Sequence, residues 1–335
     1  MQKKVFIKAI NYYLPNEVLT NAQIANKFPE WSAEKVAQKV GISERHIAAE
    51  NETAADMAYM AAERLFEEFP DDRECVDFIL LCSQSVDYKL PSSSCVLQGR
   101  LGLKSSCGAF DFNLGCSGYE YGLAVAKSLV VSGVAHEVLL LTAETYSKYI
   151  HPNDKGNTTI FGDGATATLI ASDGFALIGD FVLGTDGLGA DNLILKTGGA
   201  RFPNRSGRFT LDENGAFRWD DYLYMNGGAI FNFTAAIVPT MVNELLHKEK
   251  IGFDDIDLWV FHQANKYMIN YLRKLMSIDE KKFFVCMEKT GNTVSSTIPI
   301  ALVEAKKAGR LKGTALLAGF GVGLSWGATI LRLGE

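Results

Sequence analysis

Three residues that lie far apart in the chain could together carry out acyl transfer: Cys116 in DFNLGCSGYEYGL, His262 in FHQAN and Asn292 in TGNTVSSTIP. A cysteine thiolate is a strong nucleophile toward acyl groups. An imidazole and a side-chain amide can each donate a hydrogen bond to an oxygen that becomes negative during such a reaction. Each residue also has a plainer interpretation, as a packed core thiol, a bonded core histidine and a turn residue. Taken one at a time, these residues leave both interpretations open.

The thiol of Cys116 is predicted to lie where a strand gives way to a helix. Residues 109–113 predict a strand, the glycines that flank the cysteine permit a tight turn, and residues 117–131 predict a buried helix that ends at Gly133. At a helix start, the macrodipole and the unpaired N–H groups favour the thiolate. The sequence therefore provides a physical means of activating Cys116.

The other two residues follow elements of their own. His262 comes directly after the apolar strand 258–261, and open α/β sheets bind ligands outside the carboxyl ends of their strands. Asn292 follows Gly291 in a turn-like segment. The glycines of AGFGVGLSWG could suggest a phosphate loop, but they lack the G-x-G-x-x-G spacing and a P-loop lysine, so they are weak evidence for nucleotide binding.

Composition narrows the class of protein. With 335 residues, 47% hydrophobic and 21% charged, the chain can bury a large core, which excludes a disordered protein. Six cysteines at irregular intervals, with no C-x-x-C pair, argue against disulfides and structural zinc. A formal net charge of −6 gives no electrostatic footprint for nucleic acid. We find no signal peptide and no apolar run of membrane-spanning length, which predicts a soluble, cytoplasmic protein with no membrane partner.

An internal sequence repeat predicts two halves with the same order of strands and helices. VDFILLCSQS from Val76 matches IDLWVFHQAN from Ile256 in pattern. Two further pairs follow in the same order, GVAHEVLLLTAE with GRLKGTALLAGF and GDGATATLIAS with SWGATILRLGE. We expect a boundary near Asp173, giving halves 1–173 and 174–335 that pack as one unit.

Within each half, short apolar runs alternate with longer helix-like stretches, which favours an α/β fold with largely parallel strands. The clearest strands are residues 78–82, 138–142 and 258–262, and the clearest helices are 54–67 and 266–276. The stretch 184–219, rich in Gly, Asn and Arg, predicts long irregular loops that cover another part of the molecule.

The four motifs DFNLGCSGYEYGL, FHQAN, TGNTVSSTIP and GFGVGLSWGATIL, in this order, resemble those of β-ketoacyl-acyl carrier protein synthase III, a condensing enzyme of the thiolase-like superfamily. GISERHIAAENET and NDKGNTTIFGDGATA also resemble that family, so the resemblance spans the whole chain. It implies a five-layered αβαβα sandwich of two similar halves, the first carrying the cysteine and the second the histidine and asparagine. The family usually forms homodimers.

The resemblance also implies a reaction and a role for each residue. Cys116 would take an acyl group from coenzyme A by thioester exchange, and His262 and Asn292 would bind the thioester carbonyl of malonyl-acyl carrier protein. Decarboxylation and Claisen condensation would then give a 3-oxoacyl-acyl carrier protein, in fatty acid or related biosynthesis. The backbone N–H groups of Cys116 and Gly323 would form the oxyanion hole. No metal or redox cofactor is required, since the coenzyme A thioester is itself a substrate.

Binding residues follow from the same resemblance. Trp31 would stack on the adenine of coenzyme A and Lys155 would contact its phosphates, although the segment between Trp31 and Gly41 is longer than is usual in the family. Two further positions, Gly227 and Asn265, would line the pantetheine tunnel. Leu90 would enter the acyl pocket of the partner subunit as a gate, and Tyr146 would narrow that pocket.

Some features depart from the family and leave alternatives open. Asn232 and Tyr267 stand where lysine and arginine are common, so carrier docking would rest on Arg273 and Lys274 or be differently placed. A specialised acyltransferase or a pathway-specific condensing enzyme is one alternative, and a non-catalytic subunit that binds acyl thioesters is another. Glu144, which follows the strand 138–142, would favour the acyltransferase, but we expect it to be a solvated carboxylate at a strand end.

Overall fold

One nine-stranded mixed sheet forms the framework of the computed structural model, which describes residues 3–211 and 217–334. The strands lie in the order β13-β14-β15-β8-β1-β7-β6-β4-β5. Their bounds are Leu258–Phe261 (β13), Thr314–Gly321 (β14), Ser325–Leu333 (β15), Ala176–Thr185 (β8), Phe6–Tyr13 (β1), Gly164–Ala171 (β7), Val138–Glu144 (β6), Phe78–Cys82 (β4) and Gly108–Phe112 (β5).

Three two-stranded ladders lie outside the large sheet. β2 (Glu17–Thr20) pairs with β3 (Glu44–Ile47), β9 (Leu193–Ile194) with β12 (Tyr224–Met225), and β10 (Phe209–Leu211) with β11 (Phe217–Trp219). Three of these strands, β9, β10 and β11, belong to the segment 184–219 that the sequence predicted to be long covering loops.

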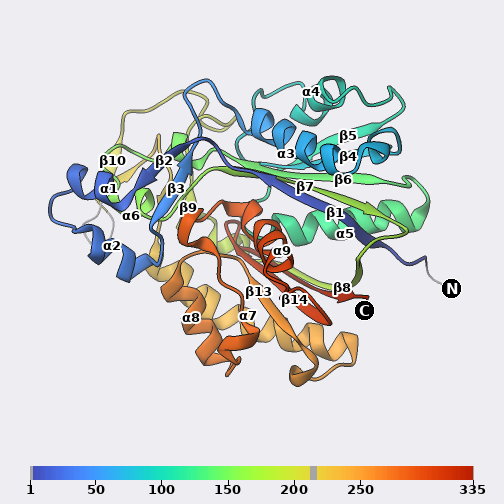
Figure 1. Ribbon diagram of the computed structural model, residues 1–335. Coiled ribbons are helices and arrows are strands. Elements are labelled where there is room, and N and C mark those ends of the chain that lie inside the picture. Colours follow the sequence, from blue (N-terminus) through green and yellow to red (C-terminus); the bar gives the residue numbers. More distant parts are fainter. Residues whose placement is uncertain (1–2, 212–216, 335) are drawn as a thin grey trace.

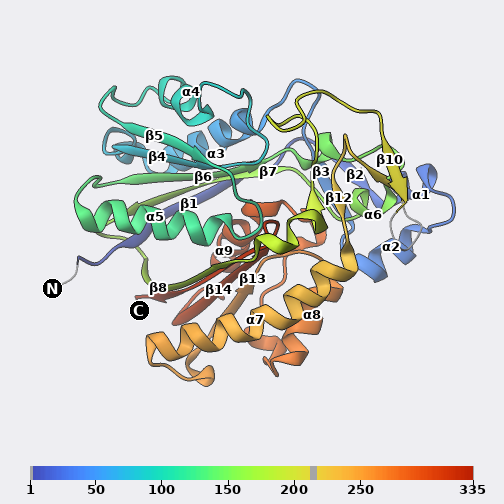
Figure 2. The ribbon, with the colours of Figure 1, turned by 180° about the vertical axis from the view of Figure 1, so that it is seen from behind.

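Helices and strands stack in five layers (Figure 1). The outer helices α3 and α4 cover the strands β4 to β7, α5 and α9 lie in the middle, and α7 and α8 cover β8 and β13 to β15 (Figures 1 and 2). The bounds are Ala54–Glu68 (α3), Ser93–Arg100 (α4), Gly118–Ser132 (α5), Thr297–Lys307 (α9), Gly227–Glu249 (α7) and Lys266–Leu275 (α8). Three short helices, Asn21–Lys27 (α1), Ala33–Val40 (α2) and Lys155–Thr158 (α6), gather beside β2 and β3 (Figure 1).

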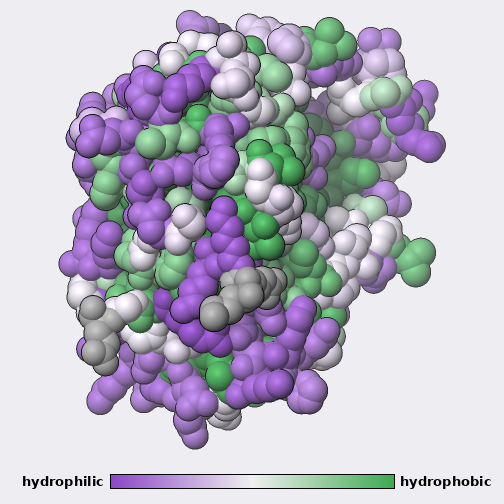
Figure 3. Space-filling view, turned by 90° about the vertical axis from the view of Figure 1, so that its right-hand side faces the viewer, coloured by the Kyte–Doolittle hydropathy of each residue, from purple (hydrophilic) through white to green (hydrophobic). Residues whose placement is uncertain are grey.

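The buried apolar residues of the described chain form three clusters. The central one packs α5 against α9, with Leu123 and Val130 on the first helix and Ile298 and Leu302 on the second, all fully or almost fully buried. A second core lies under α3 and a third under α7 and α8. Hydrophilic side chains cover most of the face in Figure 3, which also shows a hollow lined partly by hydrophobic residues at its upper right.

The repeated segments take the same places in two strand triplets. The order β4-β6-β7 repeats as β13-β14-β15, with a parallel pair followed by an antiparallel pair in each case. The prediction of largely parallel strands was wrong, because five of the eight pairings in the large sheet are antiparallel. Segments that read as continuous apolar runs are covered on both faces, and burial alone does not reveal strand direction.

Local signals explain the boundaries that matter most for the site. α5 ends at Gly133, whose φ of +76° is a conformation that glycine adopts without strain. α2 begins at Ser32, whose side chain accepts a hydrogen bond from the N–H of Lys35, and ends at Gly41, with φ +71°. The unusually long segment between Trp31 and Gly41 is therefore taken up as a helix.

Among the described residues, α7 is the helix that is long and apolar enough to cross a membrane by length and composition. Its apolar residues have another explanation, since Val238, Met241, Val242 and Leu245 are buried in the core beneath the helix. α7 packs on β8, β14 and β15, so it is the outer layer of the sandwich.

Candidate active site

A cavity of about 130 Å³ brings the three predicted catalytic residues together. Cys116, His262 and Asn292 all line it, with Gly227 and Asn265 from the predicted tunnel set. Most of the remaining lining is apolar, from Ile160, Phe161, Leu193, Met225, Ile230, Ala264, Met268 and Phe320. Such a lining suits an acyl chain and keeps water from the reacting atoms.

Cys116 lies two residues before α5 and is 7% exposed. Burial raises the pKa of its thiol to about 12, while the backbone N–H of Val322 acts in the opposite direction. The expected resting thiolate at a helix start is thus not what the structure favours, because removal from water outweighs the nearby N–H groups. A Cβ atom on Gly321 would lie 2.7 Å from Sγ, so this glycine leaves the room that the thiol occupies.

His262 is 2% exposed and stands directly after β13, where its backbone N–H donates to the carbonyl of Ala318 at 2.8 Å. Its Nδ1 lies 2.7 Å from Oγ1 of Thr297, the first residue of α9. Burial lowers the pKa of His262 to about 3, so the imidazole is neutral near pH 7. A neutral ring held at Nδ1 leaves Nε2 for a ligand.

Asn292 is bonded at its backbone and at its side chain. Its N–H donates to the carbonyl of Ile160 at 2.9 Å, and its carbonyl accepts from the N–H of Gly162 at 3.1 Å. The side-chain Oδ1 accepts from the N–H of Val294 at 2.9 Å. Because the amide oxygen is engaged, the Nδ2 donor is the group left to face a ligand in the cavity.

Backbone N–H groups near the thiol bear on the predicted oxyanion donors. The N–H of Val322, one residue before the predicted Gly323, acts on the Cys116 sulfur and lowers the pKa of the thiol, against the larger effect of burial. In the part of the chain that the structure describes, Gly321 lines the cavity whereas Gly323 does not. Gly323 has a φ of +142°, which glycine tolerates, and this residue shapes the turn between β14 and β15.

The predicted coenzyme A residues Trp31 and Lys155 come close together. The Nζ of Lys155 is 5.9 Å from the Trp31 ring centroid, and that of Lys39 is 5.0 Å from it. Lys155 also forms an ion pair with Glu30 at 2.8 Å. The ring thus has two cations beside it, a combination that suits a planar base bearing phosphates.

The two acyl-pocket residues occupy different environments. Tyr146 is buried, its hydroxyl donates to Oε1 of Gln84, and its ring centroid lies 5.2 Å from that of Phe161 in the cavity wall. It therefore supports the wall from behind. Leu90 is 82% exposed and precedes Pro91 in a cis peptide bond. This exposure leaves the side chain free to enter a neighbouring molecule.

Glu144 is not the solvated carboxylate that we expected. It is fully buried, it accepts from Oγ of Ser85 at 2.7 Å and from the N–H of Gln84 at 2.9 Å, and burial raises its pKa to about 8. The reason is that β6 runs to Glu144 itself, two residues beyond the predicted strand end. The carboxyl group braces the loop after β4, close to the cavity but outside its lining.

The two predicted docking residues on α8 are not equivalent. Arg273 has a side chain only 16% exposed, with a guanidinium that donates to the carbonyl of Ile278 at 3.3 Å and lies 3.4 Å from Glu280. Lys274 is exposed. Tyr267, where the family commonly has a cation, is 66% exposed and stacks on Phe231.

Three residues were missed by reasoning from the sequence. Thr297 contacts the ring of His262, Lys39 lies beside the ring of Trp31, and the backbone N–H of Val322 acts on the Cys116 sulfur. A hydroxyl five residues after Asn292 was visible in the motif TGNTVSSTIP, but only the fold brings it against the histidine. Lys39 could have been found only by recognising α2 as a helix that returns toward Trp31.

Known proteins share both the sequence and the fold. Residues 110–187 match the family described as 3-oxoacyl-[acyl-carrier-protein (ACP)] synthase III, and residues 246–333 match its C-terminal region. Beta-ketoacyl-[acyl-carrier-protein] synthase III of Caldanaerobacter subterraneus subsp. tengcongensis is 33% identical over 324 residues, which cover 96% of this chain and 95% of that protein.

Solved structures agree with this assignment. A 3-oxoacyl-(acyl-carrier-protein) synthase III crystal structure is 49% identical and superposes with a TM-score of 0.95, covering 98% of this chain and 100% of that one. The synthase III of Thermus thermophilus is 34% identical, with a TM-score of 0.87 and coverage of 98% and 99%. These matches show the thiolase-like fold. The chain therefore belongs to the β-ketoacyl-acyl carrier protein synthase III family, acyltransferases that catalyse the condensing reaction of fatty acid biosynthesis.

Proposed function

We propose that Cys116 is the nucleophile that carries the acyl group. The thiol attacks the thioester carbonyl of an acyl-CoA, the acyl–sulfur bond to coenzyme A breaks, and the proton of the thiol leaves with the coenzyme A thiol. One thioester replaces another, so the exchange is close to isoenergetic. Because the pKa of Cys116 is raised to about 12, the proton must leave as the attack proceeds.

His262 and Asn292 act in the second step. When malonyl-acyl carrier protein loses CO₂, the electron pair collects as an enolate on the thioester oxygen, and two neutral donors aimed at this oxygen lower the barrier. The pKa of His262, lowered to about 3, keeps the ring neutral, and the bonded Oδ1 of Asn292 leaves Nδ2 as the donor. The enolate carbon then attacks the acyl carbonyl and the Cys116 thiolate leaves. The N–H groups of Cys116 and Val322 stabilise the intermediate oxyanion.

The observation that carries this proposal is the single cavity that holds Cys116, His262 and Asn292. The test is mass spectrometry of the protein after incubation with straight and branched acyl-CoAs of increasing length. We expect an acyl adduct on Cys116 with at least one primer, followed by CO₂ release when malonyl-acyl carrier protein is added. No adduct with any primer would disprove the catalytic role, whereas an adduct without CO₂ would favour an acyltransferase that does not condense.

Thr297 is proposed to set the orientation and tautomer of His262. The Thr297 hydroxyl lies 2.7 Å from Nδ1 and 3.1 Å from the carbonyl of Val294, and its one proton can go to only one of them. We assign that proton to the shorter contact with Nδ1, so the neutral ring carries its own proton on Nε2 and can donate it to the enolate oxygen. We expect Thr297→Val to slow condensation by about tenfold while leaving loading of Cys116 unchanged, since this is the scale of one positioning hydrogen bond. Single-turnover assays of the two steps measure this. Thr297→Ser should restore condensation, and equal loss in both variants would point to packing instead.

Partners, assembly and location extend the proposal. Membership of the family implies an acyl-CoA and malonyl-acyl carrier protein as substrates.

We propose a homodimer, because β5 is an edge strand whose own Phe110 is 39% exposed, and because Leu90 protrudes. We also retain the cytoplasmic location, the boundary near Asp173 between two similar halves, and a contribution of Lys274 to carrier docking. Light scattering of the purified protein tests the dimer.

A further inference from the structure

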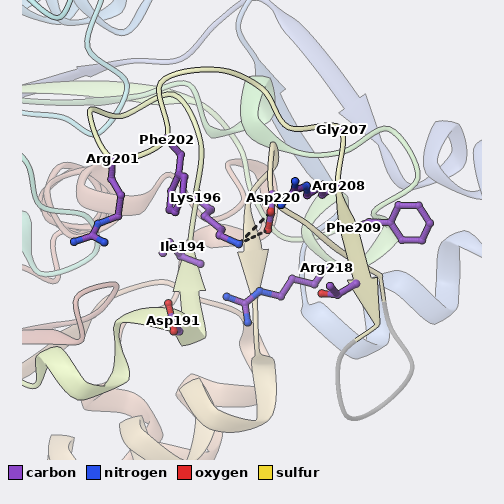
Figure 4. Close-up of a pocket in the computed structure, with 11 residues that line it drawn as sticks. Asp191, Ile194, Lys196, Arg201, Phe202, Gly207, Arg208, Phe209, Arg218 and Asp220 are labelled. Atoms are coloured by element: carbon purple, nitrogen blue, oxygen red, sulfur yellow. Dashed lines mark hydrogen bonds and ion pairs between the residues drawn. The ribbon is translucent and has the colours of Figure 1, made fainter.

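A second cavity, larger than the one at Cys116, lies among β9, β10 and β11 and plays no part in the reaction described above. Its volume is about 920 Å³, and four of its lining side chains are cationic: Lys196, Arg201, Arg208 and Arg218 (Figure 4). Two carboxylates, Asp191 and Asp220, also line it. A cavity of about 270 Å³ shares three of these four cations. Positive charge is thus concentrated here on a chain whose net charge is −6.

Most of these cations remain available to a ligand. Within the described residues, Lys196 is the lining cation that forms an ion pair, with Asp220 at 3.0 Å. The guanidinium of Arg218 lies 4.4 Å from the Tyr224 ring centroid, and Figure 4 shows it reaching below Lys196 toward the centre of the cavity. Arg201 and Arg208 form no ion pair with a described carboxylate. Guanidinium groups bind phosphate oxygens in pairs of parallel hydrogen bonds.

Two aromatic rings complete the lining. Phe202 is 44% exposed and lies beside Lys196, whereas the ring of Phe209 turns away from the cationic side chains and packs 4.7 Å from the Trp219 ring (Figure 4). Lys196 lies 5.6 Å from the Phe202 ring centroid. Cationic groups beside an exposed ring match a ligand that combines phosphates with a planar base.

The wall of this cavity is shared with the reactive site. In β9, Leu193 lines the cavity at Cys116 whereas its neighbour Ile194 lines the cationic one. In the paired strand β12, Met225 lines the first cavity and Tyr224 lies against Arg218. Successive side chains of a strand point to opposite faces, so one two-stranded ladder separates the two cavities.

We propose that this cavity is a binding site for a phosphate-bearing ligand, separate from the place where the acyl group is held. The ligand is a free nucleotide or pyrophosphate, since the base and phosphates of coenzyme A are assigned above to Trp31 and Lys155, which do not line this cavity. These sources share the phosphate groups that the arginines recognise, and the test distinguishes them.

The test is isothermal titration of the full chain with pyrophosphate, ADP and coenzyme A, comparing wild type with Arg201→Gln/Arg208→Gln. These two side chains form no ion pair with a described carboxylate, so their replacement should cost little stability. Arg64→Gln/Arg100→Gln, on the distant helices α3 and α4, is the matched control for lost charge. Unchanged loading of Cys116 at saturating acyl-CoA would show that each variant is folded.

We expect pyrophosphate or ADP to bind the wild type and the control equally, and to bind the cavity variant at least about tenfold more weakly, as for the loss of paired guanidinium contacts. If free phosphate compounds are the ligand, they will still bind when coenzyme A is saturating, and the KM for acyl-CoA will be unchanged in the variant. Competition between coenzyme A and pyrophosphate, together with a higher KM for acyl-CoA in the cavity variant, would assign the cavity to the substrate and overturn the proposal of a separate site. Absence of pyrophosphate and ADP binding to wild type, or equal binding to wild type and the cavity variant, would overturn the proposal. None of these titrations depends on condensation, so they can fail while the proposed function holds.

Discussion

Replacement of Cys116 by alanine is expected to abolish acyl loading and, with it, all condensation of a primer. No other thiol can take its place, because Cys116 is the cysteine that lines the cavity with His262 and Asn292 in the described chain. The loss should reach the detection limit, at least about 10³-fold, since the covalent intermediate cannot form. Intact-protein mass spectrometry after incubation with acyl-CoA measures it.

Cys82→Ala is the matched control for this experiment. Cys82 is also a buried thiol, and its Sγ lies within hydrogen-bonding distance of the carbonyl of Leu114, at 3.1 Å. It does not line the cavity in the part of the chain described, so its replacement should leave loading intact. An acyl adduct that persists in the Cys116 variant, or that disappears in the Cys82 variant, would contradict the assignment of the nucleophile.

Replacement of Asn292 by alanine is expected to leave loading near its normal rate and to slow condensation by about 10²- to 10³-fold, the usual cost of one oxyanion donor. Loading does not generate the enolate that Nδ2 is proposed to stabilise. Rapid-quench measurement of acyl-Cys116 formation and of CO₂ release separates the two steps.

The design must distinguish a lost donor from a disturbed turn, because Oδ1 of Asn292 also accepts from the N–H of Val294. Asn292→Asp keeps that acceptor but replaces the donor with an acceptor, so it should be as slow as the alanine variant in condensation. Recovery of CO₂ release in the aspartate variant would show that the turn matters and the donor does not. Equal loss of loading and condensation would contradict the separate roles.

The sequence was sufficient to predict which side chains meet at the reactive cavity. Cys116, His262 and Asn292 each follow or precede an element with a strong apolar pattern, and strand ends of one sheet place such residues at a common edge. Trp31 and Lys155 also come together as expected, although α2 intervenes. The grouping of these residues rests on the resemblance of the four ordered motifs to a known family, because the local patterns alone left the plainer interpretation of each residue open.

What the sequence could not provide was burial and atomic detail. Glu144 is a charged residue at the end of an apolar run, a pattern typical of an exposed strand end, yet its strand continues into the core. The pKa of Cys116 depends on the loss of water around it, which no motif records. Choosing between Val322 and Gly323 required the path of the backbone through a turn of alternating glycines.

The backbone hydrogen bonds that join Asn292 to Ile160 and Gly162 make decarboxylation depend on the intact contact between two regions of the chain. They connect the C-terminal region that carries the amide to the N-terminal region that carries the thiol. A chain in which these regions separate locally would lose the donor for decarboxylation even if Cys116 still accepted acyl groups. Malonyl units would then be spared by a damaged enzyme, because their consumption requires both regions of the molecule to be docked.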